Sequence, residues 1–280
     1  MKNSRQKGKE GRRFLIGMFV GMGIIVMLII GSLLASESPF RNRIAVIKIQ
    51  GEISPSPQML TETFTPDDAF SFIKKAEDDS SVKAVLFEID SPGGSVVASR
   101  EIAYAISEMK KPTLCWMGDI AASGAYWVAS SCDHIMADPL TLTGSIGVTA
   151  SYLEFSKLFE KYGITYEQIT SGERKDIGSP FRNMTDEERS KMEYITNEIF
   201  TYFLNDVKAK RNLTQSQIDQ IISGDIFLGK DAVALGLIDS TGTIKDAKEK
   251  VKSLAGLEQA DFVSLEKKGL GLLELLGMLG

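Results

Sequence analysis

The sequence predicts an α/β fold in which a mostly parallel sheet is flanked by helices. Short runs rich in β-branched residues alternate with segments whose apolar residues recur at helical spacing, and this alternation is typical of parallel sheets. The chain has 280 residues, of which 43% are hydrophobic and 25% are charged. It can therefore form a sizeable core in one large domain or two small ones.

The first part of the soluble region alternates between strands and helices. Runs such as IAVIKI and VKAVLFEI predict strands, at residues 44–49, 82–89, 112–116 and 135–137. Helical spacing of apolar residues predicts helices at residues 67–79, 95–109 and 123–131. Residues 52–66 are polar and contain proline, which predicts a loop near the entrance of a site.

Beyond residue 152 the sequence favours helices. Thr185 and Glu188 form a capping-box pattern that opens a helix reaching about Lys210. One face of this helix carries an apolar stripe, made of Met192, Ile195, Ile199, Phe203 and Val207. Shorter helices are expected near residues 214–222, 229–236 and 243–254.

The N-terminal part predicts a membrane anchor. Residues 1–13 carry six Lys or Arg and one Glu, a local charge of +5 in a chain whose net charge is −5. From Phe14 to Ala35 no residue is charged, and a helix of this length reaches about 33 Å, enough for a hydrocarbon core of roughly 30 Å. The positive-inside bias places the basic segment in the cytoplasm and the rest across the membrane. A cleaved signal peptide is the alternative, although the apolar run is longer than usual for one.

The remaining segments follow from these boundaries. Residues 36–41 are expected to be a linker, residues 42–265 the main folded domain, and residues 266–280 an apolar tail. The tail is expected to be a docked helix or a subunit contact, and a sharper hypothesis places it in an apolar substrate groove. Cys115 and Cys132 have no metal-site spacing and are expected to be two small buried hydrophobes rather than a disulfide. No basic stripe indicates nucleic-acid binding.

Two glycine-containing segments are candidates for acyl-transfer chemistry. Ser123 lies where a buried helix is predicted to begin, and Gly124 next to it allows its N–H to approach a developing oxyanion. Gly94 belongs to an Asp-Ser-Pro-Gly-Gly turn directly after a predicted strand, where an exposed amide suits a second oxyanion donor. One such donor contributes about 2.7–4 kcal/mol to transition-state stabilisation. Each segment alone also fits an ordinary turn or a helix cap.

A serine nucleophile needs a base, and the sequence offers two candidates. His134 is the chain's only histidine and enters a short predicted strand. Lys175 is the rival, and a lysine must be desolvated to be neutral because its unperturbed pKa is about 10.4. The residues alone leave this choice open.

Four motifs in order behind an anchor resemble the signal peptide peptidase A family of membrane-bound serine proteases, peptidase family S49. They are DSPGG at 90–94, AASGAYW at 121–127, LTGSIG at 142–147 and SGERKDIGSP at 171–180. The resemblance implies a Clp-protease/crotonase-like fold and assembly into a homo-oligomeric ring. It also implies a Ser–Lys dyad of Ser123 and Lys175, with oxyanion amides from Gly94 and Gly124. Ser145 matches the serine that orients the lysine.

Clp proteases share some of these elements but use a histidine after the corresponding strand, and residues 144–148 contain none. The Clp mechanism is therefore disfavoured. The resemblance to the signal peptide peptidase A family implies an endopeptidase for cleaved signal peptides and similar apolar peptides, with no metal or cofactor. It implies a single-pass protein of the bacterial cell membrane whose catalytic domain is extracytoplasmic. A crotonase-fold acyl-CoA enzyme and a catalytically inactive membrane scaffold are the alternatives.

Overall fold

The computed structural model describes residues 22–27, 42–58 and 61–266. The chain divides into two compact units, Met1–Arg41 and Asn42–Gly280, and each is considered by itself. In the first unit residues 22–27 are helical, and the rest of the predicted spanning segment lies outside the described residues, as does the apolar tail beyond residue 266. Within the described residues, no helix is both long enough and apolar enough to cross a membrane.

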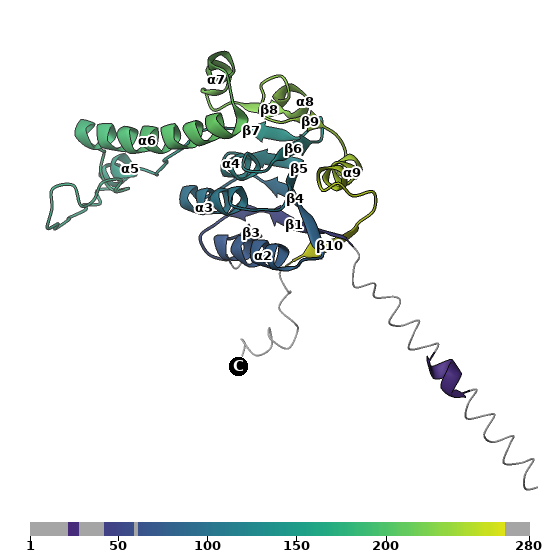
Figure 1. Cartoon of the computed structure of the whole chain (residues 1–280). Helices are drawn as coiled ribbons and strands as arrows, with labels where there is room; N and C mark the ends of the chain where they lie inside the picture. The colour runs from purple at the N-terminus through teal and green to yellow at the C-terminus, as the bar shows by residue number, and fades with distance from the viewer. Residues whose placement is uncertain (1–21, 28–41, 59–60, 267–280) are drawn as a thin grey trace, which may run out of the picture. The chain divides into compact units, whose positions relative to one another are not determined.

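A largely parallel sheet organises the second unit (Figure 1). Among the described residues its order is β10-β1-β4-β5-β6-β9, and every neighbouring pair in this order is parallel. β7 runs beside the second half of β5, and β8 pairs with β7 in the antiparallel sense. The strands of this sheet are β1 (Arg43–Gln50), β4 (Val82–Ser91), β5 (Thr113–Ala122), β6 (His134–Ala137), β7 (Leu142–Gly144), β8 (Ile226–Leu228), β9 (Ser240–Thr241) and β10 (Asp261–Leu265). The predicted α/β class is confirmed.

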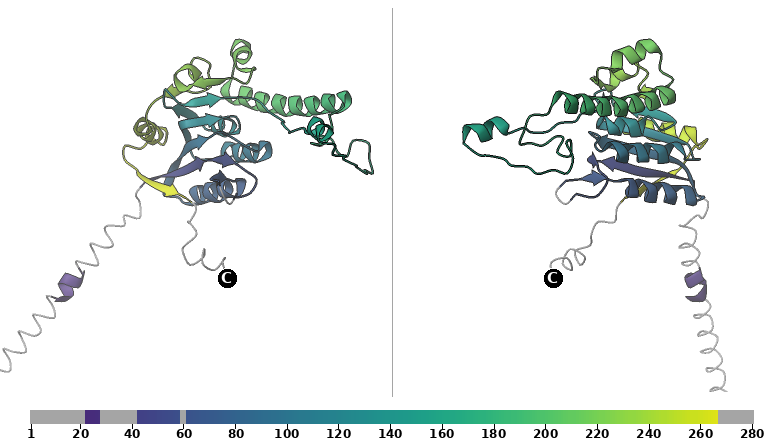
Figure 2. Two further views of the ribbon diagram at one scale, coloured as in Figure 1. Left: turned by 180° about the vertical axis from the view of Figure 1, so that it is seen from behind. Right: turned by 90° about the vertical axis from the view of Figure 1, so that its left-hand side faces the viewer.

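Helices cover both faces of the sheet (Figures 1 and 2). On one face lie α2 (Pro66–Asp78), α3 (Val96–Ser107) and α4 (Gly124–Ala129), and on the other lies α9 (Ile244–Leu254). β1 shows how the sequence fits both faces, because alternate side chains of a strand point in opposite directions. Ala45 and Ile47 join the larger core, whereas Ile44 and Val46 pack with residues of α9.

The predicted strands are found, with differences that have local causes. The strand expected at 112–116 continues to Ala122. Its first half pairs with β6, and beyond Gly118 and Asp119 its backbone pairs with a second strand, β7. The loop expected at 52–66 contains two short parallel strands, β2 (Glu52–Ile53) and β3 (Thr63–Phe64). Strands of two or three residues have too little periodicity to be recognised in a sequence.

The longest described helix is α6 (Asp186–Arg211), and its predicted capping box is present. The Thr185 hydroxyl accepts a hydrogen bond from the Glu188 N–H, and the Glu188 carboxylate accepts one from the Thr185 N–H. Near the other end of the helix, Phe203 stacks on Trp127 of α4 with ring centroids 4.4 Å apart, and both rings are buried. The C-terminal part of α6 is therefore docked on the body of the domain.

The remaining helices are α5 (Ser156–Lys161), α7 (Gln215–Ile221) and α8 (Gly229–Ala232).

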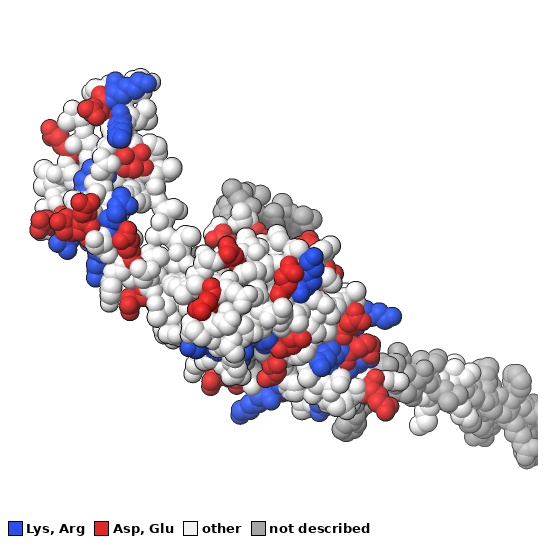
Figure 3. Space-filling model, turned by 90° about the horizontal axis from the view of Figure 1, so that it is seen from above, with Lys and Arg blue, Asp and Glu red and all other residues white. Residues whose placement is uncertain are grey.

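Residues 149–198, here named the arm, extend away from the sheet (Figures 1 and 2). They contain α5 and the first half of α6, and among them Glu188 alone is fully buried. Figure 3 shows acidic and basic side chains interspersed on the face seen from above, with an uncharged stretch where the arm joins the body. The arm therefore lacks a core of its own.

The Trp127–Phe203 stack yields a stability prediction. Phe203→Ala removes a buried ring that fixes α6 to α4, and it is expected to lower the free energy of unfolding by about 3–5 kcal/mol. The matched control is Tyr194→Ala, because that ring on the same helix is 57% exposed and its loss is expected to cost less than about 0.5 kcal/mol. Urea unfolding of the two variants measures the difference, and equal losses would contradict the docking role of Phe203.

Candidate active site

A cavity of about 360 Å³ lies where β5 and the turn after β4 meet α4 and α6. It brings together four of the predicted site residues, Gly94, Ser123, Gly124 and Ser145. Its other lining residues are Val96, Trp127, Gly147, Val148, Thr149, Phe203, Ser223 and Gly224. The carboxyl ends of parallel strands are where α/β sheets usually place their ligand sites.

Ser123 connects β5 to α4 in an unusual backbone conformation. Its φ is 53° and its ψ is −125°, and in the described chain two other non-glycine residues have a positive φ. The conformation is held in place because the Ser123 N–H donates to the Gly144 carbonyl at 2.9 Å and its carbonyl accepts from the Trp127 N–H at 3.0 Å. A strained residue that its surroundings hold this firmly is typical of active sites.

The Gly93–Gly94 turn approaches the Ser123–Gly124 turn with no side chain between the two backbones. A Cβ on Gly93 would lie 2.7 Å from the Gly124 nitrogen, and a Cβ on Gly94 would lie 2.1 Å from the Ile53 carbonyl oxygen. Both glycines also have a positive φ, of 96° and 152°. Contact distances and conformation therefore both require glycine at these positions.

Short β2 fixes this turn from the other side. The Ile53 N–H donates to the Gly93 carbonyl, and the Ser95 N–H donates to the Ile53 carbonyl, each at 2.8 Å. The Gly93 N–H is satisfied by the Ser91 hydroxyl at 3.1 Å. Among the hydrogen bonds of the described residues, neither the Gly94 N–H nor the Gly124 N–H has an acceptor. Two free amides beside a serine are the donors that an oxyanion needs.

Ser145 enters the same cavity from β7. Its φ is 50°, and its N–H donates to the Asp225 carbonyl at 2.7 Å, which joins the β7 end to the segment before β8. The Thr143 hydroxyl donates to the Ala121 carbonyl at 2.7 Å and ties β7 to the strand that carries Ser123. The two serines are thus held on neighbouring strand ends.

Lys175 is not brought to this cavity. It lies on the arm, exposed, in a turn where its N–H donates to the Gly172 carbonyl at 3.1 Å. The residues that line the cavity include no Asp, Glu, His, Lys or Arg. Ser123 therefore has no charged or titratable basic side chain beside it within the described part of the chain.

His134 lies at the opposite end of the sheet. It pairs with Leu114 near the start of β5, whereas Ser123 follows the end of that 10-residue strand, a separation of roughly 30 Å at about 3.3 Å per residue. Its Nε2 is 3.2 Å from the Ser240 hydroxyl, and burial is the main cause that lowers its pKa. Within one chain, His134 is therefore too far from Ser123 to serve it as a base.

Several residues of the site have no local sequence signal. Ile53 holds the Gly93 turn, Phe203 comes from a distant helix, and Ser99 has a buried hydroxyl without a hydrogen-bond partner. The predicted free thiols Cys115 and Cys132 are buried and unpaired. Within the described part of the chain, no group of three or more His, Cys, Asp or Glu side chains could hold a metal ion.

Gly124 gives the sharpest structural prediction for the site. A Cβ there would lie 2.2 Å from the Ser99 hydroxyl oxygen, so Gly124→Ala is expected to lower stability by about 1–3 kcal/mol and to displace the amide. The double variant Gly124→Ala with Ser99→Gly removes that hydroxyl and is expected to recover part of the stability. Gly172→Ala is the control, because nothing lies within 4 Å of its Cβ. Thermal unfolding compares the three, and an undisturbed Gly124→Ala variant would refute the close contact.

Two solved structures share the fold. Both are of the 1510-N membrane-bound stomatin-specific protease, one a serine-to-alanine mutant and one a lysine-to-alanine mutant in complex with a substrate peptide. The first has a TM-score of 0.55 and 16% identity and covers 81% of this chain and 99% of its own. The second has a TM-score of 0.53 and 19% identity and covers 85% and 97%.

Sequence comparison identifies the family. Peptidase family S49 matches residues 105–258. A putative protease of Methanocaldococcus jannaschii is 40% identical over 72% of this chain and 67% of its own length. A putative signal peptide peptidase SppA of Enterococcus faecium is 31% identical over 84% and 70%, and Protease 4 of Haemophilus influenzae is 33% identical over 78% of this chain and 36% of its own. With more than half of its residues matched, the chain belongs to peptidase family S49 and is a serine protease.

Proposed function

We propose that this serine protease is an endopeptidase that uses a Ser123–Lys175 dyad. Ser123 Oγ attacks the peptide carbonyl while neutral Lys175 takes the hydroxyl proton, and the amides of Gly94 and Gly124 hold the oxyanion. Protonated Lys175 then gives its proton to the leaving amine, and water releases the acyl group in the same way. Ser145 orients the lysine.

The observation that carries this proposal is the arrangement around Ser123. A serine with a positive φ faces a cavity together with two amides that have no acceptor in the described chain. This arrangement is expected of a nucleophile beside an oxyanion hole. Together with membership of a peptidase family, it favours a protease over the acyl-CoA enzyme and the inactive scaffold that the sequence left open.

The base is proposed to come from the arm of a neighbouring subunit in a ring. Lys175 is exposed on the arm, while the Ser123 cavity is lined by no charged side chain. The arm also exposes large apolar side chains, which suits an interface rather than solvent. They include Leu153, Leu158, Tyr162, Ile164, Ile169 and Tyr194. In such a ring each arm would cover the site of the next subunit.

Apolar peptides, such as cleaved signal peptides, are the proposed substrates. Val96, Trp127, Val148 and Phe203 give the Ser123 cavity apolar walls, and one similar protein is named a putative signal peptide peptidase. We also propose that the uncharged run from Phe14 to Ala35 anchors the protein in a bacterial cell membrane, with the protease domain outside the cytoplasm. The anchor would keep the site close to apolar peptides that leave the bilayer.

The dyad predicts that two single substitutions abolish cleavage. Ser123→Ala and Lys175→Ala are each expected to lower kcat on an apolar reporter peptide at least about a thousandfold while the domain stays folded. Lys161→Ala, another lysine of the arm, is the matched control and is expected to keep activity. Mass spectrometry after a serine-reactive fluorophosphonate checks whether Ser123 is labelled. Full activity of Lys175→Ala, or its loss in a folded His134→Ala variant, would refute the dyad.

A mixing experiment tests whether the base crosses between subunits. Ser123→Ala and Lys175→Ala protein are unfolded or dissociated together, reassembled at equal amounts and assayed. If the base comes from a neighbour, about a quarter of the sites combine an intact serine with an intact lysine, so about a quarter of wild-type activity returns. If each subunit uses its own lysine, the mixture stays inactive. Reassembled wild-type protein corrects for losses.

A further inference from the structure

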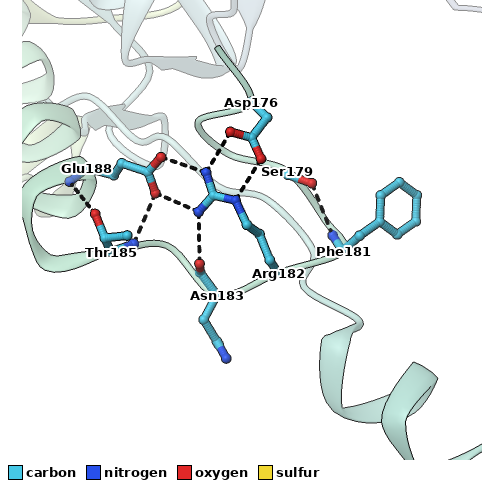
Figure 4. Close-up of polar contacts among 7 residues, drawn as sticks. All are labelled: Asp176, Ser179, Phe181, Arg182, Asn183, Thr185 and Glu188. Carbon is cyan, nitrogen blue, oxygen red and sulfur yellow. Dashed lines mark hydrogen bonds and ion pairs between the residues drawn. The ribbon is translucent and has the colours of Figure 1, made fainter. Parts of the chain in front are cut away.

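Arg182 forms the densest charge cluster of the arm. Its Nε and Nη2 donate to the two carboxylate oxygens of Asp176 at 2.6 and 2.7 Å, and its Nη1 and Nη2 donate to those of Glu188 at 2.8 and 2.6 Å (Figure 4). The Arg182 side chain is 32% exposed, that of Asp176 13% and that of Glu188 3%. Paired guanidinium–carboxylate bonds of this kind fix orientation as well as distance.

The cluster connects Lys175 to the long helix. Asp176 follows Lys175 directly, and Glu188 is part of the capping box that begins α6. The segment between α5 and α6 contains no helix or strand in the described chain, and its backbone forms turns. Arg182 therefore connects the irregular segment that carries Lys175 to the N-terminus of α6.

A second, uncharged tether holds the same segment on α5. The Phe181 ring lies 5.4 Å from that of Phe159 and 4.5 Å from that of Tyr166, and the Phe155 N–H donates to the Pro180 carbonyl at 2.7 Å. The lysine segment is thus fixed from two sides. The ring contacts of Phe181 hold the segment against α5, and the ionic bonds of Arg182 hold the backbone next to Lys175.

We propose that Arg182 is the positioning residue for Lys175, because its bonds to Asp176 and Glu188 fix the backbone from which the lysine side chain leaves. The inference rests on the proposed function, in which Lys175 is the base. A catalytic group must be held close to its productive geometry, and a displacement of about 1 Å costs up to a hundredfold in rate. Arg182 acts through the backbone of the segment that carries Lys175.

The cluster also sets the charge beside the lysine. Arg182 holds the pKa of Glu188 at about 2 and lowers that of Asp176, so both carboxylates stay ionised in the working range of the enzyme. One guanidinium and two carboxylates leave one net negative charge. Glu173, Arg174, Asp186, Glu187 and Arg189 are the other charged residues beside the cluster in the sequence, and Arg174 helps to lower the pKa of Glu187. None of these belongs to the cluster itself.

Three substitutions separate geometry from charge, using the full-length enzyme and an apolar reporter peptide. Arg182→Lys keeps the charge but loses the paired bonds, so kcat is expected to fall about tenfold or more with an unchanged acidic limb of the pH profile. Arg182→Gln leaves two negative charges, which favour the protonated lysine, so the acidic limb moves up by about half a pH unit. Asp176→Asn leaves no net charge and moves the limb down by a similar amount. KM is expected to stay within about twofold throughout.

Lys191→Gln, which removes an exposed positive charge from α6, is the control and is expected to change neither kcat nor the limb. Thermal unfolding establishes which variants are folded, and each folded one tests the proposal. An unchanged kcat in folded Arg182→Lys, or limbs that move in the same direction in Arg182→Gln and Asp176→Asn, would overturn it. An active Lys175→Ala variant would instead refute the dyad, so the two failures are distinguishable.

Discussion

The close approach of two backbone turns is the constraint on which the rest of the site depends. A Cβ on Gly93 would collide with backbone atoms of the turn at Ser123, and a Cβ on Gly94 would collide with the backbone of Ile53. Ile53 holds the first turn, and Gly144 holds the second through the Ser123 N–H. Because the bonds from Ile53 and Gly144 are made by backbone atoms, and the hydroxyls of Ser91 and Thr143 add two more, the amides of Gly94 and Gly124 are held by groups outside the side chains that line the cavity. The strain at Ser123 is maintained in the same way.

Helix α6 connects the body of the domain, where the Ser123 cavity lies, to the arm. Its C-terminal part is docked through Phe203 and Val207, and its first turn carries the capping box and the bonds of Glu188 to Arg182. A helix is stiff over this length, so the arm needs no core of its own to hold a defined direction. The single buried residue of the arm, Glu188, is accordingly an ionic anchor and not an apolar one.

The sequence predicted the regular part of the fold and most of the residues around Ser123, for physical reasons that particular residues show. Periodicity located the buried strands, and Thr185 located the start of α6, because caps and apolar alternation are local properties. Gly94, Gly124 and Ser145 could be assigned from motifs, and the structure places them in one cavity with Ser123. Ile53 and Phe203 could not be found, because strand pairs of two residues and contacts from a distant helix leave no local pattern. The sequence also could not show that Lys175 lies away from the Ser123 cavity, because this depends on the three-dimensional arrangement alone.

In the proposed dyad, that separation has a chemical consequence. A lysine in water is protonated at neutral pH, since its unperturbed pKa is about 10.4, and it cannot accept the proton of a serine. The Ser123 cavity contains no charged side chain that would stabilise an ammonium group, so a lysine that enters it is desolvated and favours the neutral form. The step that brings the base to the nucleophile is then also the step that activates it. In the proposed mechanism, a subunit whose arm stays in solvent has two free amides and a strained serine but no base, so its peptidase chemistry depends on where the arm lies.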